Sequence, residues 1–156
     1  MTHGDLFADF LKTDRSKFIG GPYNDYRAST RAWGHMVGLW VMRGYSSHVW
    51  TLKDDTVIGH GGPWYPATWP EPEFGWTLYD AAHEGKGYAI EAMTTLRDWA
   101  WSYIGLTSCV AYIDPDNHAS ANLAKRLGGA LDTDTTERPG GNENADVWRF
   151  HSGTAA

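Results

Sequence analysis

The residues best suited to binding chemistry form a glycine turn near the middle of the 156-residue chain. The turn is Glu84-Gly85-Lys86-Gly87-Tyr88-Ala89, and an apolar stripe with helical spacing follows it as far as Ile104. The first turn of a helix has backbone N–H groups without internal partners, and the helix dipole makes that end positive. Gly85 and Gly87 have no Cβ, so a bulky anion can approach the backbone there. The segment therefore predicts a phosphate site at the start of a helix over residues 88–104.

Two common nucleotide-binding motifs do not fit this turn. A P-loop would need glycine at Asp80 and serine or threonine at Gly87. A dinucleotide-binding turn of the form G-x-G-x-x-G would need glycine at Ile90. A nucleotide-binding domain is therefore only a third hypothesis, which a thermal-shift comparison of ATP, NAD and CoA would test.

A second group of polar residues follows an apolar run at residues 106–113, which is typical of a buried parallel strand. This group is Asp114-Pro115-Asp116-Asn117-His118-Ala119-Ser120, and it opens a predicted short helix over residues 117–127. Asn117 is suited to cap that helix. Ser120 adds a hydroxyl group in the first turn, so this segment also combines a helix start with polar side chains.

These two segments resemble the paired motifs of the GNAT N-acetyltransferases. Gly87 and Ala89 match the small positions of the family's pyrophosphate loop, Q/R-x-x-G-x-G/A, whereas Glu84 departs from its Gln or Arg. Residues 114–129 resemble the family's P-x-N-x-x-S…K-x-L-G segment. The form GKGYAxEA together with N-x-x-S is similar to the ribosomal-protein-alanine acetyltransferase (RimJ/RimL-type) branch. The resemblance extends over residues 18–150.

The resemblance implies an α/β (α+β) GNAT fold, in which a mixed sheet flanked by helices splays between strands at residues 74–79 and 106–113. Strands that part leave backbone groups unpaired, so the amide-bearing pantetheine arm of acetyl-CoA could lie between them like an added strand. The pyrophosphate would contact the amides of residues 85–89, Asn117 could bond a pantetheine carbonyl, and a backbone N–H near Leu78 would polarise the thioester. The implied acetyl-CoA-binding residues are Trp76, Thr77, Leu78, Glu84, Gly85, Lys86, Gly87, Tyr88, Ala89 and Asn117.

Acetyl transfer also needs a neutral amine and a proton for the leaving thiolate. Glu73 stands at the start of the strand at 74–79, where some relatives have an acidic general base, and Glu71 is the second candidate. The alternative for both is a solvated loop carboxylate. The branch resemblance implies Ser120 as the proton donor, since Ala124 occupies the position where many relatives have a tyrosine. The alternative for Ser120 is a helix-start serine bonded to the backbone.

An aromatic, proline-rich segment at residues 63–72 precedes Glu73. Its four prolines predict a stiff loop rather than a central strand. In the family the corresponding loop borders the acceptor site, so Trp64 and Trp69, with Tyr65 beside them, are candidate substrate-binding residues. The alternative is aromatic packing over the edge of the sheet.

Hydrophobic periodicity predicts the remaining elements. Helices are expected over residues 4–13 and from a cap at Asn24 or Asp25 to Met36 or beyond. Family members generally begin with a strand before the first helix. Either such a strand lies upstream of residue 1 or the sheet lacks its first edge, and we expect a six-strand core with an open or differently covered edge. The chain, 1–156, is expected to be one domain whose last few residues are disordered. Further strands are expected at residues 48–53, 56–62, 129–133 and 145–151.

Composition narrows the class of protein. The net charge of −6 argues against a nucleic-acid partner, and no apolar run is long enough to span a membrane. The N-terminus lacks the apolar core of a signal peptide, and the single cysteine, Cys109, forbids internal disulfides and fits a reducing cytoplasm. The seven histidines show no metal-ligand spacing, so no metal site is expected.

The leading hypothesis is an N-acetyltransferase that moves an acetyl group from acetyl-CoA to a primary amine by direct attack in a ternary complex. The acceptor is open between a protein N-terminus and a small amine. The alternative is a non-catalytic acyl-CoA-binding module, because the tyrosine position is vacant and the first strand is missing. The family resemblance also makes a homodimer an expectation.

Overall fold

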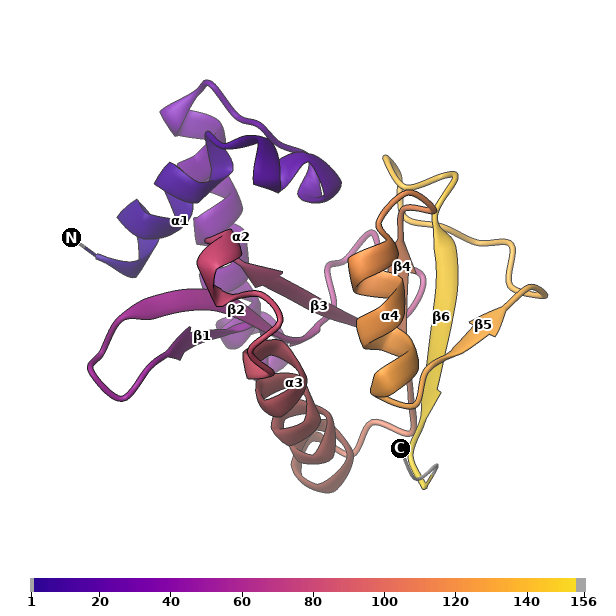
Figure 1. The fold of residues 1–156 in the computed structure, drawn as a ribbon. Coiled ribbons are helices and arrows are strands. Elements are labelled where there is room, and N and C mark those ends of the chain that lie inside the picture. The colour runs from indigo at the N-terminus through magenta and orange to yellow at the C-terminus, as the bar shows by residue number, and fades with distance from the viewer. Residues whose placement is uncertain (1, 154–156) are drawn as a thin grey trace.

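The computed structural model describes residues 2–153, which form a mixed sheet with helices packed around it (Figure 1). The disorder expected of the last few residues concerns 154–156, which lie outside this range. Six strands are hydrogen-bonded in the order β1-β2-β3-β4-β6-β5. They are β1 (His48–Thr51), β2 (Val57–Trp64), β3 (Glu73–Leu78), β4 (Ser108–Ile113), β5 (Ala130–Asp132) and β6 (Asp146–His151).

The helices agree with the predicted ones except at the end of the longest predicted helix. The run predicted over residues 88–104 is α-helical only to Trp99, and its last turn widens into a π-helical segment, η3 (Ala100–Ile104), that stops at Gly105 with φ of 80°. No helix within residues 2–153 combines the length and apolar character needed to cross a membrane. The α-helices are α1 (His3–Leu11), α2 (Tyr26–Arg43), α3 (Tyr88–Trp99) and α4 (His118–Arg126), and short 3-10 segments are η1 (Asp14–Ile19) and η2 (Ala81–His83).

The sheet begins without a strand before the first helix, as predicted. The chain from Thr2 enters α1 directly, and the Thr2 hydroxyl caps that helix by accepting from the Asp5 backbone N–H. Among residues 2–153 the first strand is β1, which pairs only with β2 and forms one edge of the sheet. The six-strand sheet with an open first edge is therefore confirmed.

The two central parallel strands part soon after they meet. β3 and β4 share one register pair, Glu73 with Val110, beside a bond from the Val110 N–H to the Pro72 carbonyl at 2.9 Å. By contrast, β2 pairs with β3 along its length, and β4 pairs with β6 throughout. The predicted splay between these strands is confirmed, and the rest of β3 has no strand partner on that side.

The structure corrects the prediction that residues 63–72 are entirely loop. Pro63 and Trp64 extend β2, where Pro63 lies opposite Phe74 and Trp64 opposite Glu73 of β3. β1 accompanies β2 only as far as Gly61, so this end of β2 is an edge with β3 as its sole neighbour. A proline costs little at such a position, because one side of the strand needs no N–H donor.

Helices from different parts of the chain pack against the separated strands β3 and β4. α3 lies against β2 and β3, and α4 lies against β4 (Figure 1). The main core between these helices and the sheet includes Phe74, Met93 and Phe150, all almost fully buried. A separate aromatic cluster around Phe7 joins α1 to α2 and to Tyr79 at the end of β3. The N-terminal helices are therefore attached to the same strand that carries the predicted cofactor site.

Candidate active site

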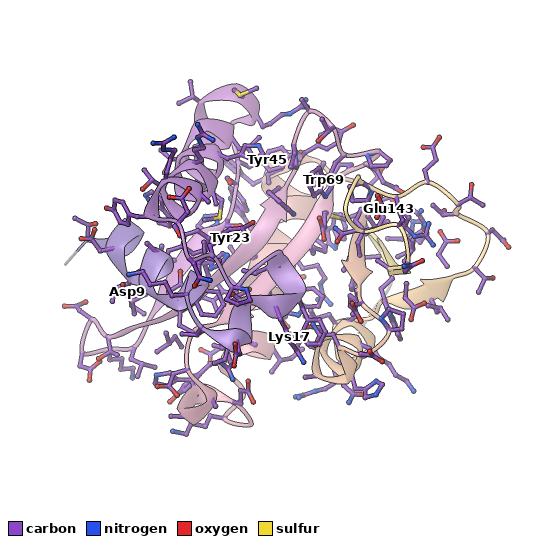
Figure 2. The ribbon with its side chains drawn as sticks, turned by 90° about the horizontal axis from the view of Figure 1, so that it is seen from above. Asp9, Lys17, Tyr23, Tyr45, Trp69 and Glu143 are labelled. Atoms are coloured by element: carbon purple, nitrogen blue, oxygen red, sulfur yellow. The ribbon has the colours of Figure 1, made fainter. Side chains whose placement is uncertain are left out.

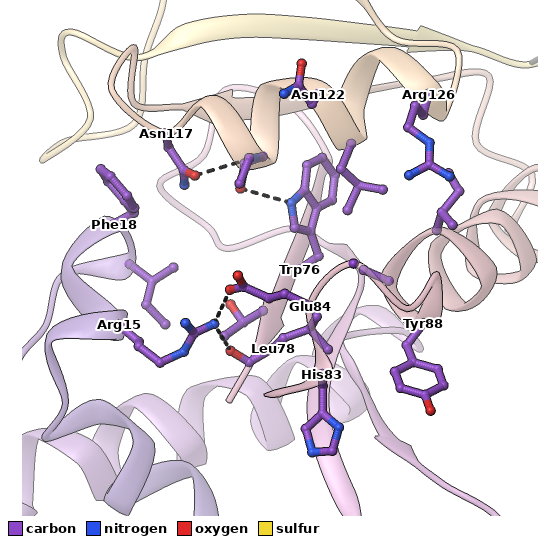
Figure 3. A pocket seen from close by; sticks show the side chains of 18 of the residues that line it. Arg15, Phe18, Trp76, Leu78, His83, Glu84, Tyr88, Asn117, Asn122 and Arg126 are labelled. Carbon is purple, nitrogen blue, oxygen red and sulfur yellow. Dashed lines mark hydrogen bonds and ion pairs between the residues drawn. The ribbon is translucent and has the colours of Figure 1, made fainter. Parts of the chain in front are cut away.

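A cavity of about 670 Å³ opens where β3 and β4 separate. Figure 3 shows α4 on one side of it and β3 with the glycine turn on the other, while η1 approaches from the N-terminal segment. Its walls include Trp76, Thr77 and Leu78 of β3, together with Asn117 of the α4 start. The predicted pantetheine and pyrophosphate residues are therefore brought together around one space.

The glycine turn presents bare backbone to this cavity. Gly85 and Gly87 have φ of 68° and 87°, and a Cβ at either position would meet no atom within 4 Å. Gly87 is the N-cap of α3 and has no side-chain capping bond, and the first helical bond runs from Glu91 N–H to the Gly87 carbonyl. The amides of residues 88–90 consequently have no intrahelical acceptor. α1, α2 and α4 are instead capped by side chains, so the start of α3 is the one that fits an external anion.

An arginine that the sequence did not single out reaches this turn. Arg15 of η1 donates from Nη2 to Glu84 Oε1 at 2.5 Å and to the Leu78 carbonyl at 3.2 Å (Figure 3). The ion pair compensates the carboxylate that Glu84 brings to a phosphate site, where the family motif has Gln or Arg. Lys86, one of the implied acetyl-CoA-binding residues, is exposed and is not among the residues that line the cavity. No local pattern marks Arg15, because its partner lies far along the chain.

A second cavity, of about 430 Å³, lies beside the first. Its lining comes from α1, η1, α2, both strands at the parting, and a loop at residues 140–142. Seen from above, Tyr23 of the N-terminal segment faces across toward Trp69 and the loop that carries Glu143 (Figure 2). This loop had no role in the sequence prediction.

The two cavities meet at the parting of β3 and β4. Six residues line both of them, and they come from η1, β3 and the start of α4. A thioester in the first cavity and an amine in the second would therefore approach each other here. The shared residues are Phe18, Ile19, Trp76, Thr77, Asn117 and Ser120.

Glu73 is a buried carboxylate in the second cavity, with only 8% of its surface exposed. Its Oε2 accepts N–H bonds from Trp64 and Trp69 at 3.0 and 2.5 Å, and its Oε1 accepts the Tyr112 backbone N–H at 3.4 Å. Burial raises the pKa of Glu73 to about 7, although these three donors act in the opposite direction. The interpretation of Glu73 as a solvated loop carboxylate is therefore wrong.

The second candidate base, Glu71, has a different environment. Its two carboxylate oxygens accept from Arg149 at 2.7 and 2.8 Å, and Arg149 also pairs with Asp132. Glu71 lines neither cavity. Both oxygens of Glu71 are therefore occupied by Arg149, outside the space that would hold an amine.

Ser120 and Asn117 form a short chain of hydrogen bonds at the junction. Asn117 Oδ1 accepts the Ser120 backbone N–H at 3.3 Å, as predicted for an N-cap, and the amide –NH₂ remains for another partner. Ser120 Oγ accepts the Trp76 indole N–H at 3.2 Å (Figure 3). Because the indole donates, the hydroxyl hydrogen of Ser120 must point to a different acceptor. This differs from the backbone-bonded serine considered as its alternative.

The aromatic residues of the 63–72 segment act on Glu73 as well as lining the second cavity. Trp64 and Trp69 pack edge to face with ring centroids 5.1 Å apart, and both indole N–H groups point at Glu73. Tyr65 turns away to Arg43, whose guanidinium stacks over its ring. Sequence reasoning proposed these tryptophans as walls but missed their hydrogen bonds to the carboxylate.

Comparison with known proteins gives a consistent result. A family model described as an acetyltransferase (GNAT) domain matches residues 2–130. The structure of an acetyltransferase from Agrobacterium tumefaciens is similar, with 34% identity, 97% of this chain and 87% of that chain covered, and a TM-score of 0.85. Curated proteins gave no match.

Two more distant structures share the fold. One is a spermidine N-acetyltransferase from Vibrio cholerae, solved with CoA and spermine, at 15% identity, 96% and 89% coverage and a TM-score of 0.70. The other is a ribosomal-protein-S5-alanine acetyltransferase from Vibrio fischeri, at 17% identity, 95% and 87% coverage and a TM-score of 0.68. The family match covers most of the chain and includes the glycine turn, so the chain belongs to the GNAT acetyltransferase family and is an acyl-CoA-dependent N-acetyltransferase.

Proposed function

We propose that the protein transfers the acetyl group of acetyl-CoA to a primary amine by direct attack, with acetyl-CoA in the first cavity and the amine in the second. The observation that carries this proposal is the junction of the two cavities at the parting of β3 and β4. Direct attack requires both substrates at once, and two connected cavities can hold both.

The first cavity can bind acetyl-CoA mainly through hydrogen bonds with the protein backbone, and less through charged side chains. The unpaired side of β3 at Trp76, Thr77 and Leu78 can bond the pantetheine amides. The amides after Gly87 can hold the pyrophosphate. Arg15 adds a cation next to this turn, and Asn117 has a free –NH₂ group for a pantetheine carbonyl.

Glu73 is the proposed general base. The acceptor ammonium first loses one proton to Glu73, directly or through water, and becomes a neutral amine. As its nitrogen attacks the thioester carbon, the C–N bond forms and the C–S bond breaks. The second proton of the nitrogen replaces the one that Ser120 gives to the leaving thiolate. A base with a pKa of about 7 is half ionised at neutral pH and accepts a proton more readily than an ordinary surface carboxylate. Its three N–H donors hold the side chain in one orientation within the cavity.

Ser120 is the proposed donor to the thiolate that leaves. It lies at the junction, where the sulfur of acetyl-CoA would meet the amine. The bond from Trp76 fixes its oxygen and leaves its hydrogen for another acceptor. Glu73 therefore lines the second cavity alone, on the side of the amine, while Ser120 lies where the two cavities meet.

The motif GKGYAIEA, together with Asn117 and Ser120, is similar to the RimJ/RimL-type branch. Both acceptor classes left open above, a protein N-terminus and a small amine, are compatible with this branch. The similar structures named above include enzymes described for each class, which shows that this fold serves both. The branch assignment therefore rests on the motif alone.

Thiol release from acetyl-CoA, measured against a panel of primary amines and N-terminal peptides, tests this function. Turnover that requires both an amine and acetyl-CoA supports the proposal. CoA binding by calorimetry without turnover on any amine would instead favour the non-catalytic acyl-CoA-binding module. Stabilisation by ATP or NAD but not by CoA would contradict both.

We also propose that the protein forms a homodimer, that it is located in the cytoplasm, and that residues 1–156 form a single domain. Exposed apolar side chains on α2, namely Val37, Val41 and Met42, offer a surface for self-association. Sedimentation of the purified protein tests the first part, and a monomer at micromolar concentration would contradict it. Cys109 is a buried free thiol, which is compatible with a reducing compartment.

A further inference from the structure

The second cavity has an unusual balance of charge. Among its lining residues the carboxylates are Glu73 and Asp114, and neither lysine nor arginine is present. Asp114 is exposed and accepts the Asp116 backbone N–H at 2.9 Å, whereas Glu73 is buried. The interior of the cavity therefore offers one buried carboxylate and neither lysine nor arginine, and His35 contributes to the lining from an exposed position on α2.

The remaining walls are largely apolar and aromatic. Phe7, Tyr23 and Met36 of the N-terminal segments face the strands, where the tryptophan pair surrounds Glu73. Rings of this kind bury large areas of ligand and lose little side-chain freedom on binding. His60 also lines this space, and burial lowers its pKa to about 4, so it adds no positive charge near neutral pH.

The walls of the second cavity should disfavour an amine that carries further charged groups besides the reacting nitrogen. A polyamine would bring further ammonium groups into a space with no second buried carboxylate, and desolvating an unpaired charge is costly. Glu71 does not supply that carboxylate, because Arg149 holds both of its oxygens. A free amino acid would bring a carboxylate next to Glu73 with no cation to pair it, which is unfavourable for the same reason.

We propose that the acceptor is a small primary monoamine whose remaining part is apolar or aromatic and has no second charge. The ammonium group enters toward Glu73, gives up its proton there, and the apolar part packs on the ring-lined wall of the second cavity. This inference rests on the proposed acetyl transfer, and it adds the class of amine.

A matched series of amines tests this class. Thiol release is measured with 2-phenylethylamine, with phenylalanine, which adds a carboxylate, with spermine, which adds ammonium groups, and with a phenylalanine-initiated tetrapeptide. We expect kcat/KM for 2-phenylethylamine to exceed that for each of the others by at least about tenfold. A higher value for spermine, phenylalanine or the peptide would overturn the monoamine assignment while leaving acetyl transfer intact. No turnover with any of the four, despite CoA binding, would overturn both.

A charge change in the wall gives a second test. Met36→Glu adds a carboxylate to the part of the cavity lining that comes from α2, and Met36→Gln is the control of equal size without charge. We expect the ratio of kcat/KM for 1,4-diaminobutane over 2-phenylethylamine to rise about tenfold in Met36→Glu and to change little in Met36→Gln. An unchanged ratio in a folded Met36→Glu protein, judged by its melting curve, would contradict the proposed occupancy. Should the glutamate variant fail to fold, the wild-type series above still decides the assignment.

Discussion

The cofactor half and the acceptor half of the junction are built in different ways. The proposed cofactor half is centred on one continuous segment, from the end of β3 through the glycine turn to α3, which offers backbone N–H groups, and residues of η1 and α4 complete its walls. The proposed acceptor half draws its lining from both N-terminal helices, three strands (β2, β3 and β4) and the loop at 140–142. Under the proposed function, backbone groups would bind acetyl-CoA, and side chains would determine which amine enters. The contrast explains how one fold can keep acetyl-CoA and change its acceptor.

The two halves also differ in electrostatics. The start of α3 is open and lacks a side-chain cap, which suits an anion. The acceptor half instead contains the acidic group Glu73, and burial raises the pKa of this carboxyl although its indole donors act in the opposite direction. Mutations in one half should therefore alter one substrate and spare the other. The predictions below test that separation, beginning with the largest expected effect.

Glu73→Gln should impair catalysis without weakening CoA binding. Removal of a general base is expected to lower kcat by about 10²- to 10⁴-fold, while CoA affinity by calorimetry stays within a few-fold. Glu71→Gln is the control, because Glu71 lies outside both cavities, and it should lower stability more than turnover. Wild-type kcat in a folded Glu73→Gln protein would remove the assignment.

The pH dependence should carry the signature of the same group. Because the base must be ionised, kcat/KM should rise through about pH 7 in the wild type, and this rise should be absent in Glu73→Gln. Stability should move in the opposite sense. The folded carboxyl holds its proton more tightly than the unfolded one, so its stabilising effect is complete below pH 4.5 and is lost as pH rises to about 7. Unfolding curves of both proteins across this range measure the difference, and parallel curves would contradict the shifted pKa.

Gly87→Val should break the cofactor half alone. A β-branched side chain at φ of 87° strains the turn and blocks the approach of the pyrophosphate, so the Kd for CoA should rise by at least about tenfold. Gly105→Val is a matched control, since Gly105 also has positive φ, 80°, and open space at the far end of the same helical run. Both variants should lose similar stability, and only Gly87→Val should lose affinity. Equal CoA affinity in the two would exclude the phosphate site.

Ser120→Ala should slow the departure of the thiolate, which would take place where the two cavities meet. Loss of the proton donor is expected to lower kcat by about tenfold, with CoA affinity within a few-fold. A substrate with a better thiol leaving group should recover part of this loss, since it needs less protonation. Recovery would not occur if Ser120 only braces Trp76 through their hydrogen bond. Unchanged turnover in Ser120→Ala would exclude the donor role.

Arg15→Gln should produce the smallest change, and it tests how charge next to the glycine turn affects CoA binding. The variant leaves the Glu84 carboxylate unpaired next to the phosphate site, so the Kd for CoA should rise by about three- to tenfold. The double variant Arg15→Gln/Glu84→Gln should recover most of that affinity, because the repulsive charge is gone. Arg31→Gln, at an exposed position on α2 outside the cofactor cavity, is the control. Additive losses in the double variant would contradict the compensating role of Arg15.

The sequence predicted the fold well because the fold depends on local signals, and the same kind of signal marks the candidate cofactor site. Helix periodicity, strand composition and the glycines of the turn act over a few residues, and the splay followed from the resemblance those motifs carried. The strand limits at Pro63 and the π-helical end at Ala100 escaped it, because they depend on where β1 ends and how η3 packs.

The order of elements, the anion-binding helix start and the candidate pair Glu73 and Ser120 could be inferred from the amino-acid sequence by itself. Only the tertiary structure decided that Glu73 is buried under two indoles, that Arg15 reaches Glu84, and that η1 helps to line both cavities. The reason is physical: a pKa depends on burial and neighbours in space. Residues 69 positions apart, such as Arg15 and Glu84, become neighbours only when the chain has folded.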